Sequence, residues 1–110
     1  MEERTFQFAS RVRKLVKRLP RTIGNLDGKQ VVRSSGSVGS NYIEANEPLG
    51  DKDFLLRVKT ARKEAKESRY WLQLLDCDDR APLDQERVFL IQEATELVLI
   101  FSAIIRRRSG

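Results

Sequence analysis

Carboxylates and an arginine recur at helical spacing in two stretches of this sequence. Glu64 and Glu67 lie three residues apart, and an earlier segment carries the polar row Arg33, Ser37, Asn41 and Glu44. Two carboxylates beside an arginine could perform acid/base chemistry. The same grouping also forms buried or interfacial networks that fix helix register or subunit geometry, and we expect this second role. The expected members of the network or interface are Arg33, Ser37, Asn41, Glu44, Glu64, Glu67 and Trp71.

The remaining parts of a catalytic or metal site are missing from the sequence. It contains no histidine, which excludes Ser-His-Asp and Cys-His nucleophilic sites and His-ligated metal sites. The Gly/Ser-rich segment 33–40 lacks the Gly-Lys-Ser/Thr ending of a phosphate-binding loop. The aspartates around Cys77 lack the glycine and distal glutamate of a calcium loop, so a polar turn is expected there. We therefore expect no catalytic residue, cofactor or metal.

Two rows of cations are the most suggestive surface features. One row has a 3-4-3 spacing near the N-terminus, and the other lies in a later segment and leads to a tyrosine. Regularly spaced cations on a helix can follow a phosphate backbone, and a tyrosine can stack on a base. Each row could equally be an ordinary solvated face. The candidate nucleic-acid-binding residues are Arg11, Lys14, Arg18, Arg21, Lys59, Lys63, Lys66 and Tyr70.

The net charge of +5 is concentrated in the N-terminal third of the chain. Residues 1–33 contain nine Lys/Arg against three Asp/Glu, a local charge of +6. This asymmetry is compatible with an anionic partner, although it does not identify one.

Helical periodicity runs through every interval between Pro20, Pro48 and Pro82. It predicts helices over about residues 4–19, 26–46, 51–76 and 83–106, with Asp51 as the N-cap of the third. At 110 residues the chain has the length of one domain, 1–110. Short connections favour antiparallel neighbours. We therefore expect an all-α fold, an antiparallel up-down-up-down four-helix bundle.

The Gly/Ser-rich segment fits the second helix of this bundle. If residues 28–46 are helical, Val31, Val38 and Tyr42 fall on one line. Each internal glycine costs roughly 1 kcal/mol relative to alanine in a helix. The expected benefit is close approach of another helix over Gly36 and Gly39.

The fourth segment carries more apolar surface than a single bundle core requires. Such a surplus usually indicates contact between subunits. The candidate oligomer-interface residues outside the core stripe are Phe89, Leu99, Ile100 and Ala103.

The cellular location is expected to be cytoplasmic. The N-terminus is acidic and polar rather than a secretory signal, and a single cysteine fits a reducing compartment. No uninterrupted apolar run approaches the ~18 residues of a membrane span, so no membrane is expected as a partner.

Two stretches, residues 31–45 and 51–75, together carry a distinctive set of motifs. The first contains Arg-Ser…Ser-x-x-x-Asn-x-x-Glu-Ala, and the second contains Asp-Phe and then Ala-x-x-Glu-Ala-x-Glu-Ser-x-Tyr-Trp-Leu. The motif positions are Arg33, Ser34, Ser37, Asn41, Glu44, Ala45, Asp53, Phe54, Ala61, Glu64, Ala65, Glu67, Ser68, Tyr70, Trp71 and Leu72. Over about residues 25–76 the chain resembles the bacterial four-helix-bundle family first associated with intervening sequences in 23S rRNA genes.

This resemblance implies a small antiparallel bundle that assembles into a ring-shaped homo-oligomer, typically a homopentamer, without established enzymatic activity. Nucleic-acid binding is suspected for the family. We therefore expect a non-enzymatic homo-oligomer that presents basic helix faces to nucleic acid, with RNA favoured over DNA. The alternative is a structural or adaptor bundle that binds a protein partner and no nucleic acid.

Overall fold

The chain is described here by a computed structural model that covers residues 1–47 and 49–109. Its four α-helices are α1 (Glu2–Arg18), α2 (Gly28–Ala45), α3 (Asp51–Leu74) and α4 (Ala81–Ser109). A short 3-10 helix, η1 (Ile23–Asn25), precedes α2. No strand occurs among the described residues, and the expected all-α class with four helices is confirmed.

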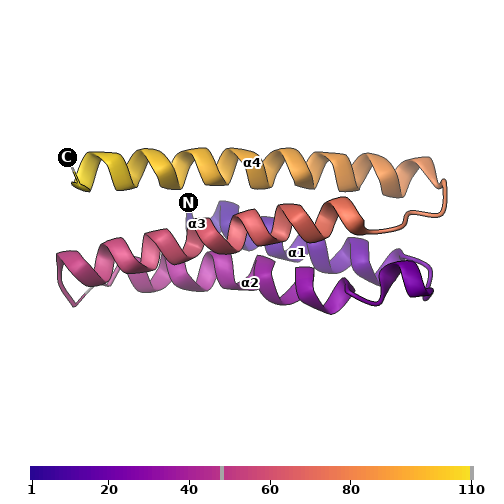
Figure 1. Cartoon of the computed structure of the whole chain (residues 1–110), viewed down its shortest axis with the longest axis horizontal. Helices are drawn as coiled ribbons and strands as arrows, with labels where there is room; N and C mark the ends of the chain where they lie inside the picture. Colours follow the sequence, from indigo (N-terminus) through magenta and orange to yellow (C-terminus); the bar gives the residue numbers. More distant parts are fainter. Residues whose placement is uncertain (48, 110) are drawn as a thin grey trace.

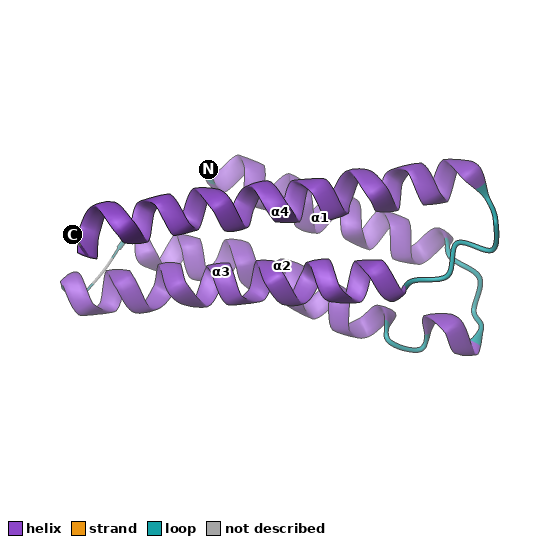
Figure 2. Cartoon of the chain, turned by 45° about the horizontal axis from the view of Figure 1, so that its top comes forward, coloured by secondary structure: helices purple, strands orange, loops and turns teal. Residues whose placement is uncertain are grey.

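Consecutive helices run in opposite directions and lie side by side (Figures 1 and 2). α3 packs extensively against both α2 and α4, whereas α1 and α4 share a smaller contact. The bundle measures 46 × 21 × 19 Å. It is elongated because α4, with 29 residues, is ~43 Å long at 1.5 Å per residue.

The observed helix ends differ from the expected ones by at most three residues, and α3 begins at residue 51 as expected. α2 begins at Gly28 rather than near residue 26, because η1 occupies the preceding turn. The prediction that Asp51 caps α3 is wrong. The cap residue is Gly50, whose φ of 149° favours glycine, and Asp51 is the first helical residue. Pro48, expected to mark this turn, lies outside the described residues.

The core is the shared apolar seam of the four helices. Phe8 and Leu15 of α1, Val38 of α2, Leu72 of α3 and Phe101 of α4 are at most 1% exposed. The core-facing residues of α3 repeat about every 3.5 positions. This repeat places its small residues in the core, where they allow the neighbouring helices to approach. One polar pair is buried there as well, since the Ser68 hydroxyl donates to the Ser34 hydroxyl at 2.9 Å and joins α3 to α2.

The two glycines of α2 have different surroundings. A Cβ added at Gly39 would lie 3.1 Å from Oγ1 and 3.4 Å from Cβ of Thr5 on α1. At Gly36 the nearest atom would be Nη2 of Arg13, at 3.8 Å. Close helix approach is therefore observed over Gly39, and the same expectation for Gly36 is wrong.

A single asparagine joins the two loops at one end of the bundle. The side-chain amide of Asn25 donates to the carbonyl oxygens of Pro20, at 2.8 Å, and Asp76, at 2.9 Å. Its Oδ1 accepts a hydrogen bond from the Asp76 backbone N–H at 2.8 Å. Asn25 therefore ties the α1–α2 connection to the α3–α4 connection.

We predict that Asn25→Ala lowers the free energy of unfolding by about 2 kcal/mol, because it removes three hydrogen bonds at a half-buried site. Urea denaturation followed by circular dichroism measures this change. Asn46→Ala is the control, since among the described residues the exposed Asn46 side chain makes one hydrogen bond, to Glu2, and its removal should cost less than about 1 kcal/mol. Equal destabilisation of both variants would contradict the proposed role of Asn25 in linking the two connections.

α4 leaves apolar surface uncovered along part of its length. Figure 1 shows the N-terminus lying part-way along α4, so the last turns of α4 extend beyond α1. Within the described residues, α4 has the length and mean hydropathy, 1.9 over 18 residues, to cross a membrane. An apolar core helix of a bundle meets the same condition, and α4 carries Glu93 and Glu96, both paired with Arg4. Length and composition therefore do not make α4 a membrane span.

Candidate nucleic-acid interface

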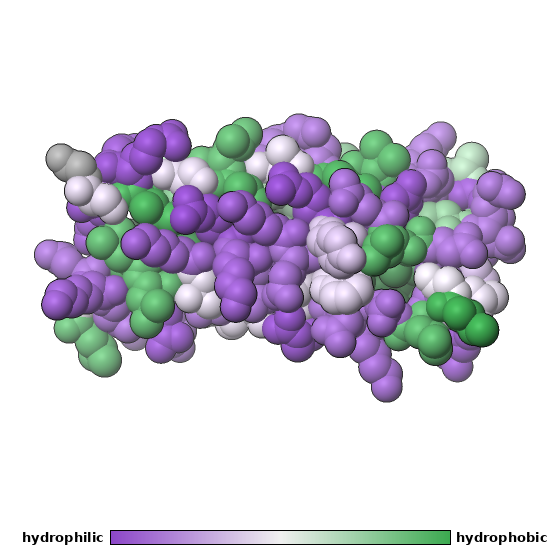
Figure 3. Space-filling view, viewed as in Figure 1, coloured by the Kyte–Doolittle hydropathy of each residue, from purple (hydrophilic) through white to green (hydrophobic). Residues whose placement is uncertain are grey.

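The outer side of α3 carries a shallow hollow of about 500 Å³, which we call the α3 hollow. Hydrophilic residues cover the middle of the face that includes α3 (Figure 3). Cations and aromatic rings line the hollow together because residues three and four apart share one face of a helix. The lining residues are Lys59, Arg62, Lys63, Lys66, Glu67, Tyr70 and Trp71.

The three lysines of the α3 hollow have no acidic partner in the part of the chain that the structure describes. No carboxylate oxygen lies within 4.0 Å of Lys59, Lys63 or Lys66, and all three side chains are exposed. The Arg62 guanidinium donates to the hydroxyl of Ser102 on α4 at 3.3 Å. The predicted row Lys59–Lys63–Lys66–Tyr70 therefore lies in one hollow with its ammonium charges uncompensated.

The aromatic part of the hollow is a pair of adjacent rings. Tyr70 is 56% exposed. Its ring centroid lies 5.1 Å from that of Trp71, with the ring planes at 74°. Trp71 is half-buried against the core, so it supports an exposed tyrosine ring beside the lysines.

One member of the α1 cation row, Arg11, is held by residues of α4. Arg11 donates from Nε to Glu86 of α4 at 2.9 Å and lies over the Phe89 ring, 3.9 Å from its centroid. The hydrogen bond to Glu86 raises the pKa of Arg11. Lys14 and Arg18 line a second hollow with these residues, of about 550 Å³. Arg21 lies apart, beside the α1–α2 connection, so this row is interrupted.

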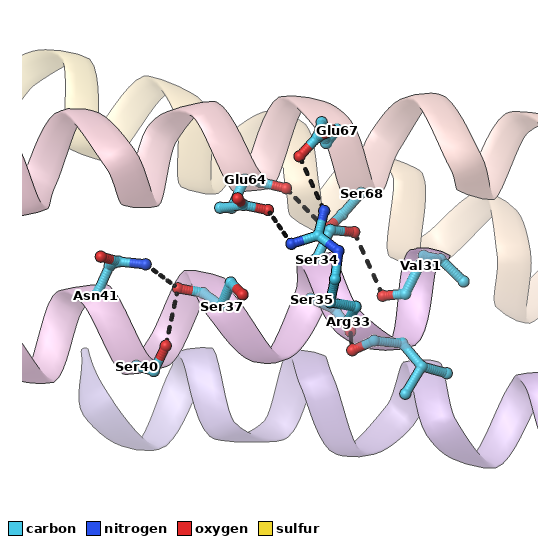
Figure 4. Close-up of polar contacts among 11 residues, drawn as sticks. Val31, Arg33, Ser34, Ser35, Ser37, Ser40, Asn41, Glu64, Glu67 and Ser68 are labelled. Carbon is cyan, nitrogen blue, oxygen red and sulfur yellow. Dashed lines mark hydrogen bonds and ion pairs between the residues drawn. The ribbon is translucent and has the colours of Figure 1, made fainter. Parts of the chain in front are cut away.

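The polar network joins α2 to α3 through one arginine. Arg33 of α2 reaches Glu64 with Nη1 at 3.5 Å and Glu67 with Nη2 at 3.2 Å (Figure 4). Glu64 is 8% exposed, and Ser68 is completely buried one turn further along. Glu67 also lines the α3 hollow, so its ion pair with Arg33 offsets part of the negative charge there.

The other expected members of the network do not join it. Asn41 donates to the backbone carbonyl of Ser37 on its own helix at 2.9 Å (Figure 4). Glu44 is exposed. Trp71 lies in the α3 hollow, and among the described residues its buried Nε1 has no hydrogen-bond partner. The structure therefore brings together Arg33, Glu64 and Glu67 only.

Burial raises the pKa of the Glu64 carboxyl, and a hydrogen bond with Glu67 raises it further, against the lowering effect of Arg33. At pH values between the ordinary pKa and this raised pKa, the folded state binds more protons than the unfolded chain. The contribution of Glu64 to stability therefore decreases as pH rises through that window.

We predict that Glu64→Gln removes this pH-dependent destabilisation, so its free energy of unfolding relative to wild type increases as the pH rises above the ordinary pKa of a glutamate. Urea denaturation at several pH values measures the difference. Glu44→Gln, which removes an exposed carboxylate from α2, is the matched control. A difference from wild type that stays constant with pH would contradict the prediction for Glu64.

Sequence reasoning missed the ion pairs between α1 and α4. Arg4 donates to Glu93 from Nε at 2.7 Å and to Glu96 from Nη2 at 2.9 Å. The hydrogen bond to Glu93 is the largest cause of a raised Arg4 pKa. No spacing signal could reveal these pairs, because they depend on the register of two helices at opposite ends of the sequence.

The candidate oligomer-interface residues lie in two places. Phe89, 48% exposed, lies beneath Arg11 at the α1–α4 hollow. Leu99 is 64% exposed, and Ile100 and Ala103 are half-buried. These last three lie in the C-terminal half of α4.

The turn around Cys77 contains aspartates but no metal-type cluster. Cys77 is buried, and burial raises the pKa of its thiol. Asp78 and Asp79 have positive φ values of 53° and 55°. Among residues 1–47 and 49–109, no three His, Cys, Asp or Glu side chains converge as metal ligands.

Comparisons with known proteins agree with this architecture. A crystal structure of a protein with unknown function from the S23 ribosomal protein family of Bacteroides thetaiotaomicron matches with a TM-score of 0.78 and 28% identity. The match covers 94% of this chain and 96% of that chain. No curated protein matches significantly. Residues 1–100 match the family described as 23S rRNA-intervening sequence protein, and the chain belongs to that family.

Proposed function

We propose that this protein is a non-enzymatic bundle that binds RNA through the α3 hollow. The observation that carries the proposal is a row of three lysines without acidic partners in the described chain, leading to an exposed tyrosine. Lysine ammonium groups bind phosphates as point charges, and RNA presents phosphates at regular spacing. We propose RNA rather than DNA as the partner; the family description names an intervening sequence of 23S rRNA and does not name a ligand.

A non-enzymatic role fits the arrangement of the polar side chains. Glu64 and Glu67 are held by Arg33, and Glu44 lies away from them. In the described part of the chain, no nucleophile lies paired with a base near these carboxylates. The chain contains no histidine that could serve as that base.

The proposal includes assembly into a homo-oligomer, a ring of five subunits being what the family resemblance implies. Exposed Leu99 and half-buried Ile100 and Ala103 supply apolar surface on α4 for subunit contact. A closed ring would repeat the α3 hollow around its axis, so that modest single contacts become multivalent. A cytoplasmic location belongs to the same proposal, because free, buried Cys77 fits a reducing compartment.

The experiment is light scattering combined with the ratio of absorbance at about 260 and about 280 nm, on protein purified from cells at low salt. We expect a mass of several subunits and co-purifying RNA that RNase removes. A single stoichiometric protein partner without nucleic acid would replace the proposal with the adaptor alternative. A mass of one subunit would contradict the proposed homo-oligomer.

A further inference from the structure

We infer that the α3 hollow selects single-stranded RNA, with an unpaired base stacked on Tyr70 and the neighbouring phosphates on the lysine row. This inference rests on the proposed function and names the form of RNA that the site takes. It starts from the fact that the hollow combines cations with an exposed aromatic ring, whereas a phosphate backbone alone requires only the cations.

The spacing along α3 suits a short run of nucleotides. Lys59 and Tyr70 are eleven residues apart, which corresponds to ~17 Å along the helix at 1.5 Å per residue. Stacked nucleotides rise by about 3.4 Å each, so this length accommodates roughly five of them. The lysines can therefore hold successive phosphates while a base at the end of the run reaches Tyr70.

The ring geometry favours an unpaired base. Trp71 meets Tyr70 edge-on, at 74°, and therefore leaves a face of the exposed Tyr70 ring for another planar group. A base inside a duplex is already stacked between its neighbours, whereas an unpaired base of a single strand can offer its face at a lower cost. Aromatic side chains that stack on bases are a common feature of single-strand binding sites.

The one acidic side chain of the hollow does not oppose this partner. The Glu67 carboxylate accepts a hydrogen bond from Arg33 at 3.2 Å, and this ion pair offsets part of its charge, since Arg33 also pairs with Glu64. The field in the hollow is then set by Lys59, Arg62, Lys63 and Lys66. An acidic protein would satisfy these charges too, but it would not require the tyrosine ring.

The test uses the intrinsic fluorescence of Trp71, the only tryptophan in the sequence. The full-length protein is titrated with a single-stranded RNA of about ten nucleotides, with a blunt RNA duplex of the same length, and with polyglutamate. We expect the single strand to bind most tightly and to change the Trp71 emission. We expect polyglutamate to leave the emission unchanged.

Substitutions at Tyr70 make the test specific. Tyr70→Leu should weaken single-strand binding by about 5- to 150-fold, the range for removing one base–aromatic stack, and leave the salt dependence of binding unchanged. Tyr70→Phe keeps the ring and should bind like wild type. Because Tyr70 is exposed, all variants should fold, which circular dichroism verifies.

Two results would overturn the inference. If duplex or polyglutamate binds as tightly as the single strand and Tyr70→Leu has no effect, base stacking is wrong. The proposed RNA binding through the lysines is then retained if Lys59, Lys63 and Lys66 are necessary for RNA binding. If none of the RNAs binds, the inference and the proposed function both fail.

Discussion

Replacing Lys59, Lys63 and Lys66 together by glutamate should weaken RNA binding by about 100-fold at ~0.1 M salt. Each exposed ion pair between a lysine and a phosphate contributes up to about 1 kcal/mol, and 1.4 kcal/mol corresponds to a factor of about ten in affinity. Charge reversal adds repulsion between the new carboxylates and the phosphates. The bundle should remain folded, because all three side chains are exposed and form no ion pair among the described residues. Fluorescence anisotropy of labelled RNA measures the affinities.

The matched control is the triple variant Lys14→Glu, Lys17→Glu and Arg18→Glu on α1. It changes the net charge by the same amount at three exposed side chains. We expect the affinity to fall by less than about tenfold, because of the weaker overall field of the protein. If the α1 variant weakens binding as much as the α3 variant, RNA binding is not localised to the α3 hollow.

Gly39→Leu should lower the free energy of unfolding by about 2 kcal/mol, because the site has no room for a side chain. A Cβ there would already lie 3.1 Å from Oγ1 of buried Thr5, and the backbone carbonyl carbon of Thr5 lies 3.8 Å away. Overpacking of this kind typically costs roughly 1–3 kcal/mol, even though leaving glycine improves helix propensity. The melting temperature should fall by roughly 10 °C.

The control for Gly39 lies one helical turn away on α2. Gly36→Ala should stabilise the protein by up to about 1 kcal/mol, since its Cβ would meet only Arg13, at 3.8 Å, and alanine favours the helix. Gly39→Ala should stabilise less than Gly36→Ala or should destabilise. Equal stabilisation by alanine at both positions would show that α1 does not approach α2 closely over Gly39.

The fold was predictable because its main determinant, the period of apolar residues, is local. Buried Val58, Ala65 and Leu72 repeat at spacings that belong to one helix face, whatever that face packs against. The prediction of close helix approach is correct for Gly39 and wrong for Gly36, because close approach is not determined locally. Which glycine meets α1 depends on the crossing point of two helices, and sequence periodicity contains no information about that point.

In the candidate site, too, features within one helix were predictable and contacts between helices were not. The row Lys59, Lys63 and Lys66 lies together because its members share one helix. The α1 row is broken by the pair of Arg11 with Glu86, 75 positions away in sequence. Asn41 was expected in the network with Arg33, but it donates to its own helix, because a backbone carbonyl one turn back is always within reach of such a side chain.

The salt dependence of wild-type affinity for a single-stranded RNA tests whether the uncompensated cations of the α3 hollow bind RNA. Four phosphate contacts, one for each cation of the hollow, predict a log–log slope of about −3. Between about 50 and about 300 mM salt the affinity should then fall by about 100-fold. An affinity that is unchanged over this range, or the absence of binding at the lower salt, would contradict the claim.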